Sequence, residues 1–121
     1  MSPPLSRLVL YTKRMDDMVA FYETHFDYRA ERLEGDRIVE LIPPGAGVHL
    51  MLHAAGNATR EGQVTVKLVF DVLDVAAFCA QARRKGLEFG AIHNADGYAF
   101  ANAKDPSKNS ISVSSRAFAT R

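Results

Sequence analysis

The chain has 121 residues, of which 47% are hydrophobic, and its formal net charge is +1. This length fits a single domain, and a nearly neutral chain predicts neither a nucleic-acid partner nor binding to an anionic membrane. The lone cysteine, Cys79, excludes an internal disulfide framework and predicts a reducing compartment, the cytoplasm. Neither a signal-peptide pattern nor an apolar run of membrane-spanning length is apparent, so we expect neither export nor membrane insertion.

The first half of the chain predicts one strand, one helix and three more strands. Branched and aromatic residues favour a strand over Arg7–Thr12, and apolar residues then recur at helical spacing from Met15 to Phe26. Asp16 and Asp17 lie in the first turn of this helix, where carboxylates suit the helix dipole. The three further strands are expected over Tyr28–Leu33, Arg37–Ile42 and Val48–His53.

The second half repeats this order after a small, polar segment at residues 54–62. A strand is expected over Val64–Val72, and Asp74 can cap a helix that ends at Lys85-Gly86. Three short strands are expected to follow, over Leu87–Ile92, Tyr98–Ala103 and Ser110–Ser115, with a turn at residues 105–109 between the last two.

The fold class predicted from this order is α+β, with two βαβββ modules in one domain over residues 1–121. Module one covers about residues 6–53, the linker about 54–62, and module two about 63–116. Alternation in the strands predicts one sheet face under a helix and one face left open. The two curved mixed sheets are expected to form a cup, with the helices on its outer face.

Three local motifs resemble the vicinal oxygen chelate superfamily, which includes glyoxalase I, bleomycin resistance proteins and extradiol dioxygenases. They are Phe21-Tyr22 in the first helix, the run from Phe70 to Val75 that leads into the second helix, and the turn from Asp105 to Asn109. The resemblance covers about residues 7–115 and implies the two-module fold. It does not single out an activity, because this fold supports isomerases, dioxygenases, lyases and binding proteins.

The resemblance also implies four strand positions that hold a divalent metal in the enzymes of the family. In this chain those positions match Arg7, Met51, Lys67 and Ser112, with Met51 placed to within one or two residues. Arginine and lysine are cationic donors and cannot usefully coordinate a divalent metal, methionine is a soft ligand and serine a poor one. We therefore expect no metal or other cofactor. The turn also differs from the family pattern, since Lys108 occupies a position where the family usually has glycine, and we expect a positive φ there.

The open faces supply the candidate ligand-binding residues. Alternation places Arg7 and Lys67 there, and two cations at equivalent positions favour an anionic ligand. Each could instead form a structural salt bridge, with Glu40 or Asp71. His49 and His53 share one face of a strand but lie about 13 Å apart, too far for one metal; half-buried wall residues are the simpler interpretation. The full candidate set is Arg7, Tyr11, His49, Met51, His53, Lys67, Asn102 and Ser112.

The main hypothesis is a binding protein for a small organic, anionic molecule that works without the family's metal. The alternative is a metal-dependent lyase or dioxygenase that uses shifted ligands, His49 or His53 with Glu40. A third possibility is metal-free catalysis with Lys67 or His53 as the base and Arg7 as the oxyanion partner. Catalytic residues are not identified. We expect a small-molecule partner and a homodimer, because open sheets leave edges that a second copy can cover.

Overall fold

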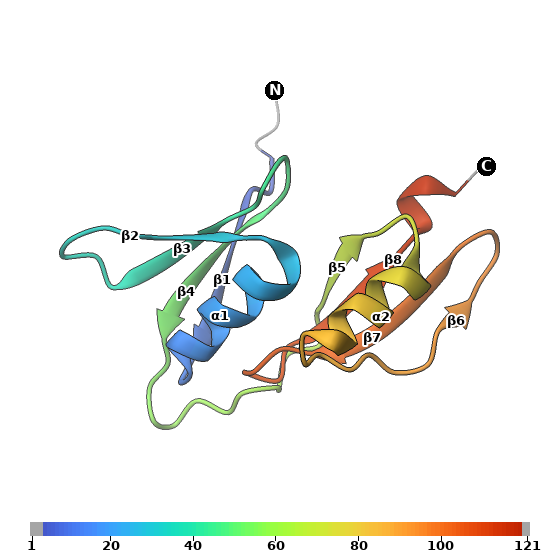
Figure 1. The fold of residues 1–121 in the computed structure, drawn as a ribbon. Coiled ribbons are helices and arrows are strands. Elements are labelled where there is room, and N and C mark those ends of the chain that lie inside the picture. Colours follow the sequence, from blue (N-terminus) through green and yellow to red (C-terminus); the bar gives the residue numbers. More distant parts are fainter. Residues whose placement is uncertain (1–3, 120–121) are drawn as a thin grey trace. The chain divides into compact units, whose positions relative to one another are not determined.

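The computed structural model describes residues 4–119, which form two compact units with their boundary between Glu61 and Gly62 (Figure 1). Each unit has one helix and one four-stranded mixed sheet, as the two-module prediction requires. The boundary falls within the predicted linker at residues 54–62. Within residues 4–119, no helix is long and apolar enough to cross a lipid bilayer. The α+β fold class is confirmed, whereas the cup between the sheets stays a prediction.

Unit 1 consists of β1 (Arg7–Thr12), α1 (Met15–Phe26), β2 (Arg29–Arg32), β3 (Ile38–Ile42) and β4 (His49–Ala54). The strand order in its sheet is β1-β4-β3-β2, with β1 parallel to β4 and the other pairs antiparallel. Apolar side chains of α1 and of the alternate positions of β3 and β4 are buried, and they form the core: Met18, Val19, Tyr22, Phe26, Val39, Leu41, Leu50 and Leu52. Burial of each large side chain stabilises the unit by about 1.5–3 kcal/mol.

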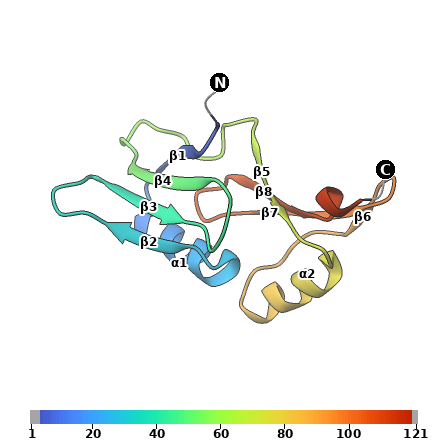
Figure 2. The same ribbon diagram turned by 90° about the horizontal axis from the view of Figure 1, so that it is seen from above.

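Unit 2 consists of β5 (Lys67–Asp71), α2 (Val75–Arg84), β6 (His93–Asn94), β7 (Ala99–Lys104) and β8 (Ser110–Ser114), followed by a 3-10 turn, η1 (Arg116–Phe118). The strand order is β5-β8-β7-β6, and β5 is parallel to β8 as β1 is to β4. Figure 2 shows α2 on one side of the strands of this unit. The core residues on that side are Val75, Ala82, Leu87, Ala101, Ile111 and Val113.

The predicted signals at the ends of α2 are confirmed. The carboxylate of Asp74 accepts a hydrogen bond from the backbone N–H of Ala77 at 3.0 Å, which satisfies one of the free donors at the start of the helix. Gly86 follows the helix with φ +96°, a conformation that other residues adopt only with strain. The backbone N–H of Leu87 reaches back to the carbonyl of Ala82 at 2.9 Å and completes the C-cap.

The strand predicted over Leu87–Ile92 is wrong. This segment is irregular, and β6 is a two-residue strand at His93–Asn94. The backbone of Leu87 belongs to the C-cap of α2, and the ring of Phe89 packs edge-on against Phe78 at 6.2 Å. Gly90 donates one hydrogen bond to the carbonyl of Asn102, so the segment lies beside β7 without a regular ladder.

The turn between β7 and β8 has the backbone that the sequence predicts. Lys108 adopts φ 67°, in the left-handed region, at the position where the resemblance implied a glycine. Asp105, which is buried, holds the turn: one carboxylate oxygen accepts from the backbone N–H groups of Ser107 and Asn109, and the other accepts from the side-chain amide of Asn109. These three hydrogen bonds support the strained residue between them.

Candidate functional site

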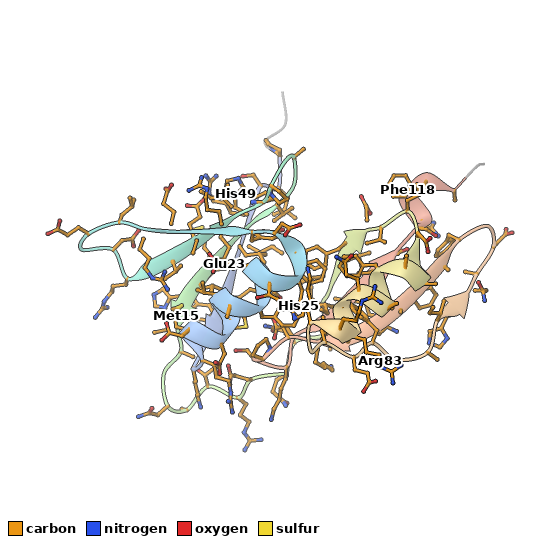
Figure 3. All side chains as sticks on the ribbon, viewed as in Figure 1. Met15, Glu23, His25, His49, Arg83 and Phe118 are labelled. Atoms are coloured by element: carbon orange, nitrogen blue, oxygen red, sulfur yellow. The ribbon has the colours of Figure 1, made fainter. Side chains whose placement is uncertain are left out.

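The open face of unit 1 carries a cluster of three charged or titratable side chains. In the parallel register Arg7 of β1 lies opposite His49 of β4, and Glu40 reaches them from β3. One oxygen of Glu40, Oε2, accepts from Arg7 Nε at 3.2 Å and from His49 Nδ1 at 2.7 Å. His49 is the first residue of β4 and is labelled in Figure 3. The salt bridge considered for Arg7 in the sequence is therefore present, with Glu40 as its partner.

The electrostatics of this cluster favour an ionised Glu40. The hydrogen bond from His49 is the main cause that lowers the pKa of Glu40, the Arg7 guanidinium lowers it further, and burial opposes both. Because a carboxylate can only accept, Nδ1 of His49 carries a proton. In neutral His49 the other ring nitrogen, Nε2, is then a proton acceptor.

The remaining candidates of unit 1 share this face, because alternate strand positions point the same way. Val9 lies opposite Met51, and Tyr11 lies opposite His53 with their ring centroids 5.2 Å apart. His53 Nδ1 is 2.8 Å from the carbonyl oxygen of Ala54. Tyr11 is 57% exposed, so this end of the face presents an aromatic surface to solvent.

The open face of unit 2 is lined by lysine, serine and asparagine side chains. Lys67, Ser110 and Lys104 form one row across β5, β8 and β7. Lys67 Nζ donates to Asn102 Oδ1 at 2.9 Å, and Lys104 Nζ donates to Ser110 Oγ at 2.9 Å. Both ammonium groups thus lean over the middle of the sheet. Neither lysine forms an ion pair with another residue of the described chain.

Ser112 lies in the next row, opposite Val69 and Asn102. Its side chain is 2% exposed, and its hydroxyl donates to the carbonyl of Ala101 at 3.0 Å. It is thus more deeply placed than the other candidates, and its hydroxyl already has a partner within the sheet.

The strand registers make the two open faces equivalent. Arg7 pairs with His49 in unit 1, and Lys67 pairs with Ser110 in unit 2. Met51 and Ser112 lie two residues further along their strands, so they occupy corresponding positions. The four residues that the family resemblance implied as metal positions in the sequence therefore form two matched pairs, one on each open face.

These residues do not fit a divalent metal. Arginine and lysine bring positive charge to the position, and the hydroxyl of Ser112 is engaged with the backbone. Among residues 4–119, no three histidine, cysteine, aspartate or glutamate side chains come together in a group that could hold a metal ion. Glu40 and His49 are in contact, but in the described part of the chain this pair has no third ligand beside it.

Unit 2 also has a concavity of about 400 Å³ at the far end of its open face, which the sequence did not predict. Its lining consists of Val69, Asp71, Ser114, Arg116 and Ala117. The last two belong to η1, the turn that contains Phe118 in Figure 3. The sequence gives no periodic signal for this turn, because it is only three residues long.

Arg116 is held in place within this concavity by Tyr98. Its Nη1 donates to the Tyr98 hydroxyl oxygen at 3.0 Å, and its guanidinium carbon lies 5.1 Å from the centre of the Tyr98 ring. The backbone N–H of Arg116 also donates to Ser114 Oγ at 3.1 Å. These contacts fix the position of a cation whose other guanidinium donors are available.

Cys79 lies away from the open faces of both sheets and is not one of the candidate site residues. Cys79 lies on α2 and is partly buried, and burial raises the pKa of its thiol. A thiol with a raised pKa is a poor nucleophile, so the structure favours a packing role for Cys79.

A family model, described as "Glyoxalase/Bleomycin resistance protein/Dioxygenase superfamily", matches residues 5–113. Solved structures of similar fold include UcmS2 (19% identity, TM-score 0.78, covering 95% of this chain and 99% of that one). TnmS3, an antibiotic binding protein from a Streptomyces species, is 19% identical with a TM-score of 0.75, over 93% of this chain and 94% of its own. A lactoylglutathione lyase from Agrobacterium tumefaciens is 22% identical with a TM-score of 0.69, and the match covers 93% of this chain and 95% of that one. No curated protein sequence matches. The chain belongs to the glyoxalase/bleomycin resistance protein/dioxygenase superfamily.

Proposed function

We propose that the protein binds a small organic anion on the open faces of its sheets, without the divalent metal of the family's enzymes. The observation that carries the proposal is the matched placement of Arg7 and Lys67. Both are the first residues of parallel strands at a sheet edge, and both are exposed on the face that the helix does not cover. Cations at equivalent positions attract negative charge where the family's enzymes attract a metal.

The surroundings of the two cations differ, and unit 2 is the stronger anion site. The charge of Arg7 is offset by Glu40 at 3.2 Å. Lys67 and Lys104 instead have neutral partners, Asn102 and Ser110, so their positive charge is not cancelled locally. A carboxylate or phosphate above this row can accept charge-assisted hydrogen bonds from both ammonium groups.

The related fold of TnmS3, an antibiotic binding protein, supports a binding role, since it shows that this fold can hold an organic molecule. The chemistry of Arg7, Met51, Lys67 and Ser112 supports the metal-free part of the proposal. The metal-dependent alternative requires a ligand set built from other residues, and Glu40 with His49 is its starting pair.

The test is to identify what co-purifies with the protein. Native mass spectrometry of protein purified from rich medium should detect a bound organic anion, and elemental analysis should find metal well below one equivalent. A stoichiometric transition metal, together with a melting temperature that falls on chelation, would overturn the proposal in favour of the metal-dependent enzyme.

A matched pair of variants locates the site. Lys67→Gln removes the charge from the open face, and Arg84→Gln removes one from α2, on the other side of the sheet. The apparent affinity is measured by thermal shift for a panel of organic carboxylates and phosphates. It should be about tenfold lower for Lys67→Gln than for the wild type, and unchanged for Arg84→Gln. Equal effects of the two variants would contradict a site on the open face.

We further propose a homodimer in the cytoplasm. Strands β1 and β5 are the terminal strands of their own sheets, and a terminal strand offers backbone groups on its outer side that a second copy can pair with. The free Cys79 supports a reducing compartment. Gel filtration with light scattering tests the dimer, and a monomeric mass at micromolar concentration would contradict it.

A further inference from the structure

The concavity at the end of unit 2 combines two opposite charges that do not pair with each other. Asp71 of β5 and Arg116 of η1 both line it. No salt bridge joins them, and the carboxylate of Asp71 has no hydrogen bond to any side chain or backbone group among residues 4–119. Opposite charges that share a small concavity without closing on each other leave room for a molecule between them.

The protein itself explains why the two charges stay apart. Tyr98 holds the Arg116 guanidinium by one hydrogen bond and by its ring face, and Ser114 holds the Arg116 backbone. Arg116 is thus kept away from Asp71 and still offers donors in a planar arrangement that matches a carboxylate. Asp71 can only accept when ionised, so a group that it binds must be a donor, best a cation.

We propose that this concavity is a subsite for a zwitterion, a small molecule with an ammonium group bound by Asp71 and a carboxylate bound by Arg116. The inference rests on the proposed function, since it places the ligand on the same open face, and it adds a positive group to that ligand. Val69 and Ala117 provide an apolar wall for the carbon chain between the two charges. The volume of about 400 Å³ lies within the range of small-molecule sites.

The experiment uses the full chain, labelled with ¹⁵N, and a series of probes. Glycine, β-alanine and 4-aminobutyrate have the two charges at increasing separation, while acetate and ethylammonium have one charge each. Amide shifts of Val69, Asp71, Ser114 and Ala117 report on the concavity. We expect one spacing of the zwitterion to bind at least about tenfold more tightly than acetate or ethylammonium.

The variants assign each charge to its partner. Asp71→Asn should lower zwitterion affinity to that of acetate, and Arg116→Gln should lower it to that of ethylammonium. Tyr98→Phe removes the hydroxyl but keeps the ring, so it should weaken binding less than Arg116→Gln does. Arg83→Gln is the control, because Arg83 pairs with Glu88 at 3.2 Å on α2, as Figure 3 locates it. An unchanged amide spectrum verifies that each variant folds.

Two results overturn the inference. In the first, acetate binds as tightly as the best zwitterion, or Asp71→Asn leaves the preference for the zwitterion over acetate unchanged. Asp71 then has no role in ligand recognition, while the proposal of anion binding is unaffected. If no probe shifts the four amides, the concavity is not a ligand site. Failure of the proposed function is seen separately, as the absence of a co-purified anion and of any effect of Lys67→Gln.

Discussion

The Glu40 carboxylate links β1, β3 and β4 on the open face of unit 1, and Glu40→Gln tests how much its charge contributes. Oε2 accepts from Arg7 Nε at 3.2 Å and His49 Nδ1 at 2.7 Å. The side chains of Glu40 and His49 are 27% exposed and that of Arg7 is 50% exposed, so the bond to His49 is the better shielded. Glutamine retains a neutral acceptor, and we expect a loss of about 1 kcal/mol in the free energy of unfolding at pH 7.

The effect should depend on pH with a defined sign. The pKa of Glu40 is lowered in the folded protein from its ordinary value of 4.5, mainly by the hydrogen bond from His49. An ionised Glu40 therefore stabilises the fold at pH values above 4.5, and this contribution is lost as the pH falls through the lowered pKa. The difference between the wild type and Glu40→Gln should thus shrink between pH 7 and pH 3.

Urea unfolding at pH 7 and pH 3 measures this difference. A loss of 1 kcal/mol corresponds to a midpoint lowered by about half a molar. Glu31→Gln is a suitable control on β2, since Glu31 pairs with Arg29 at 3.6 Å and both side chains are more exposed; its midpoint should hardly change. Equal losses for Glu40→Gln at both pH values would refute the argument, because the effect would then come from shape and not from charge.

Three other variants test the local structure, each by urea unfolding. Asp74→Ala removes the acceptor for the Ala77 backbone N–H at 3.0 Å and should lower the free energy of unfolding by about 1 kcal/mol, while Asp74→Ser should retain most of it. Asp105→Ala removes the carboxylate that accepts from buried Ser107 and half-buried Asn109 in the β7–β8 turn and should lower it by about 2–4 kcal/mol; a loss below about 1 kcal/mol would count against this role of Asp105. Lys108→Asn should raise it by up to about 1 kcal/mol, because asparagine tolerates φ 67° better than lysine; a decrease would contradict the strain.

The sequence predicts those parts of the fold that have a regular period or a local chemical signal. Alternation placed Arg7 and Lys67 on the exposed faces of their strands, as observed. Asp74 and Gly86 marked the ends of α2 because capping depends on a few neighbouring residues. The strand expected over Leu87–Ile92 does not form, because its residues make other contacts: Leu87 belongs to the C-cap of α2 and Phe89 packs against Phe78. Within this segment, Gly90 is the residue that bonds to the backbone of β7.

The candidate site was predicted in part. The pairing of Arg7 with Glu40 could be named as an option, because both residues alternate onto one face. That His49 shares the same oxygen of Glu40 depends on the β1–β4 register, which the sequence does not specify. The contact between Arg116 and Tyr98 depends on the 3-10 turn after β8, for which no residue pattern is diagnostic.

In each unit the first strand pairs in parallel with the last, and this affects the order in which the sheets can form during synthesis. β1 cannot pair until β4 exists, and β5 cannot pair until β8 exists, so each sheet closes only when its unit has been synthesised in full. On a ribosome, unit 1 has all four strands once Ala54 has emerged. A nascent chain that stops before Ser110 therefore carries one finished sheet, and a second in which β5 and β7 both lack the strand that joins them.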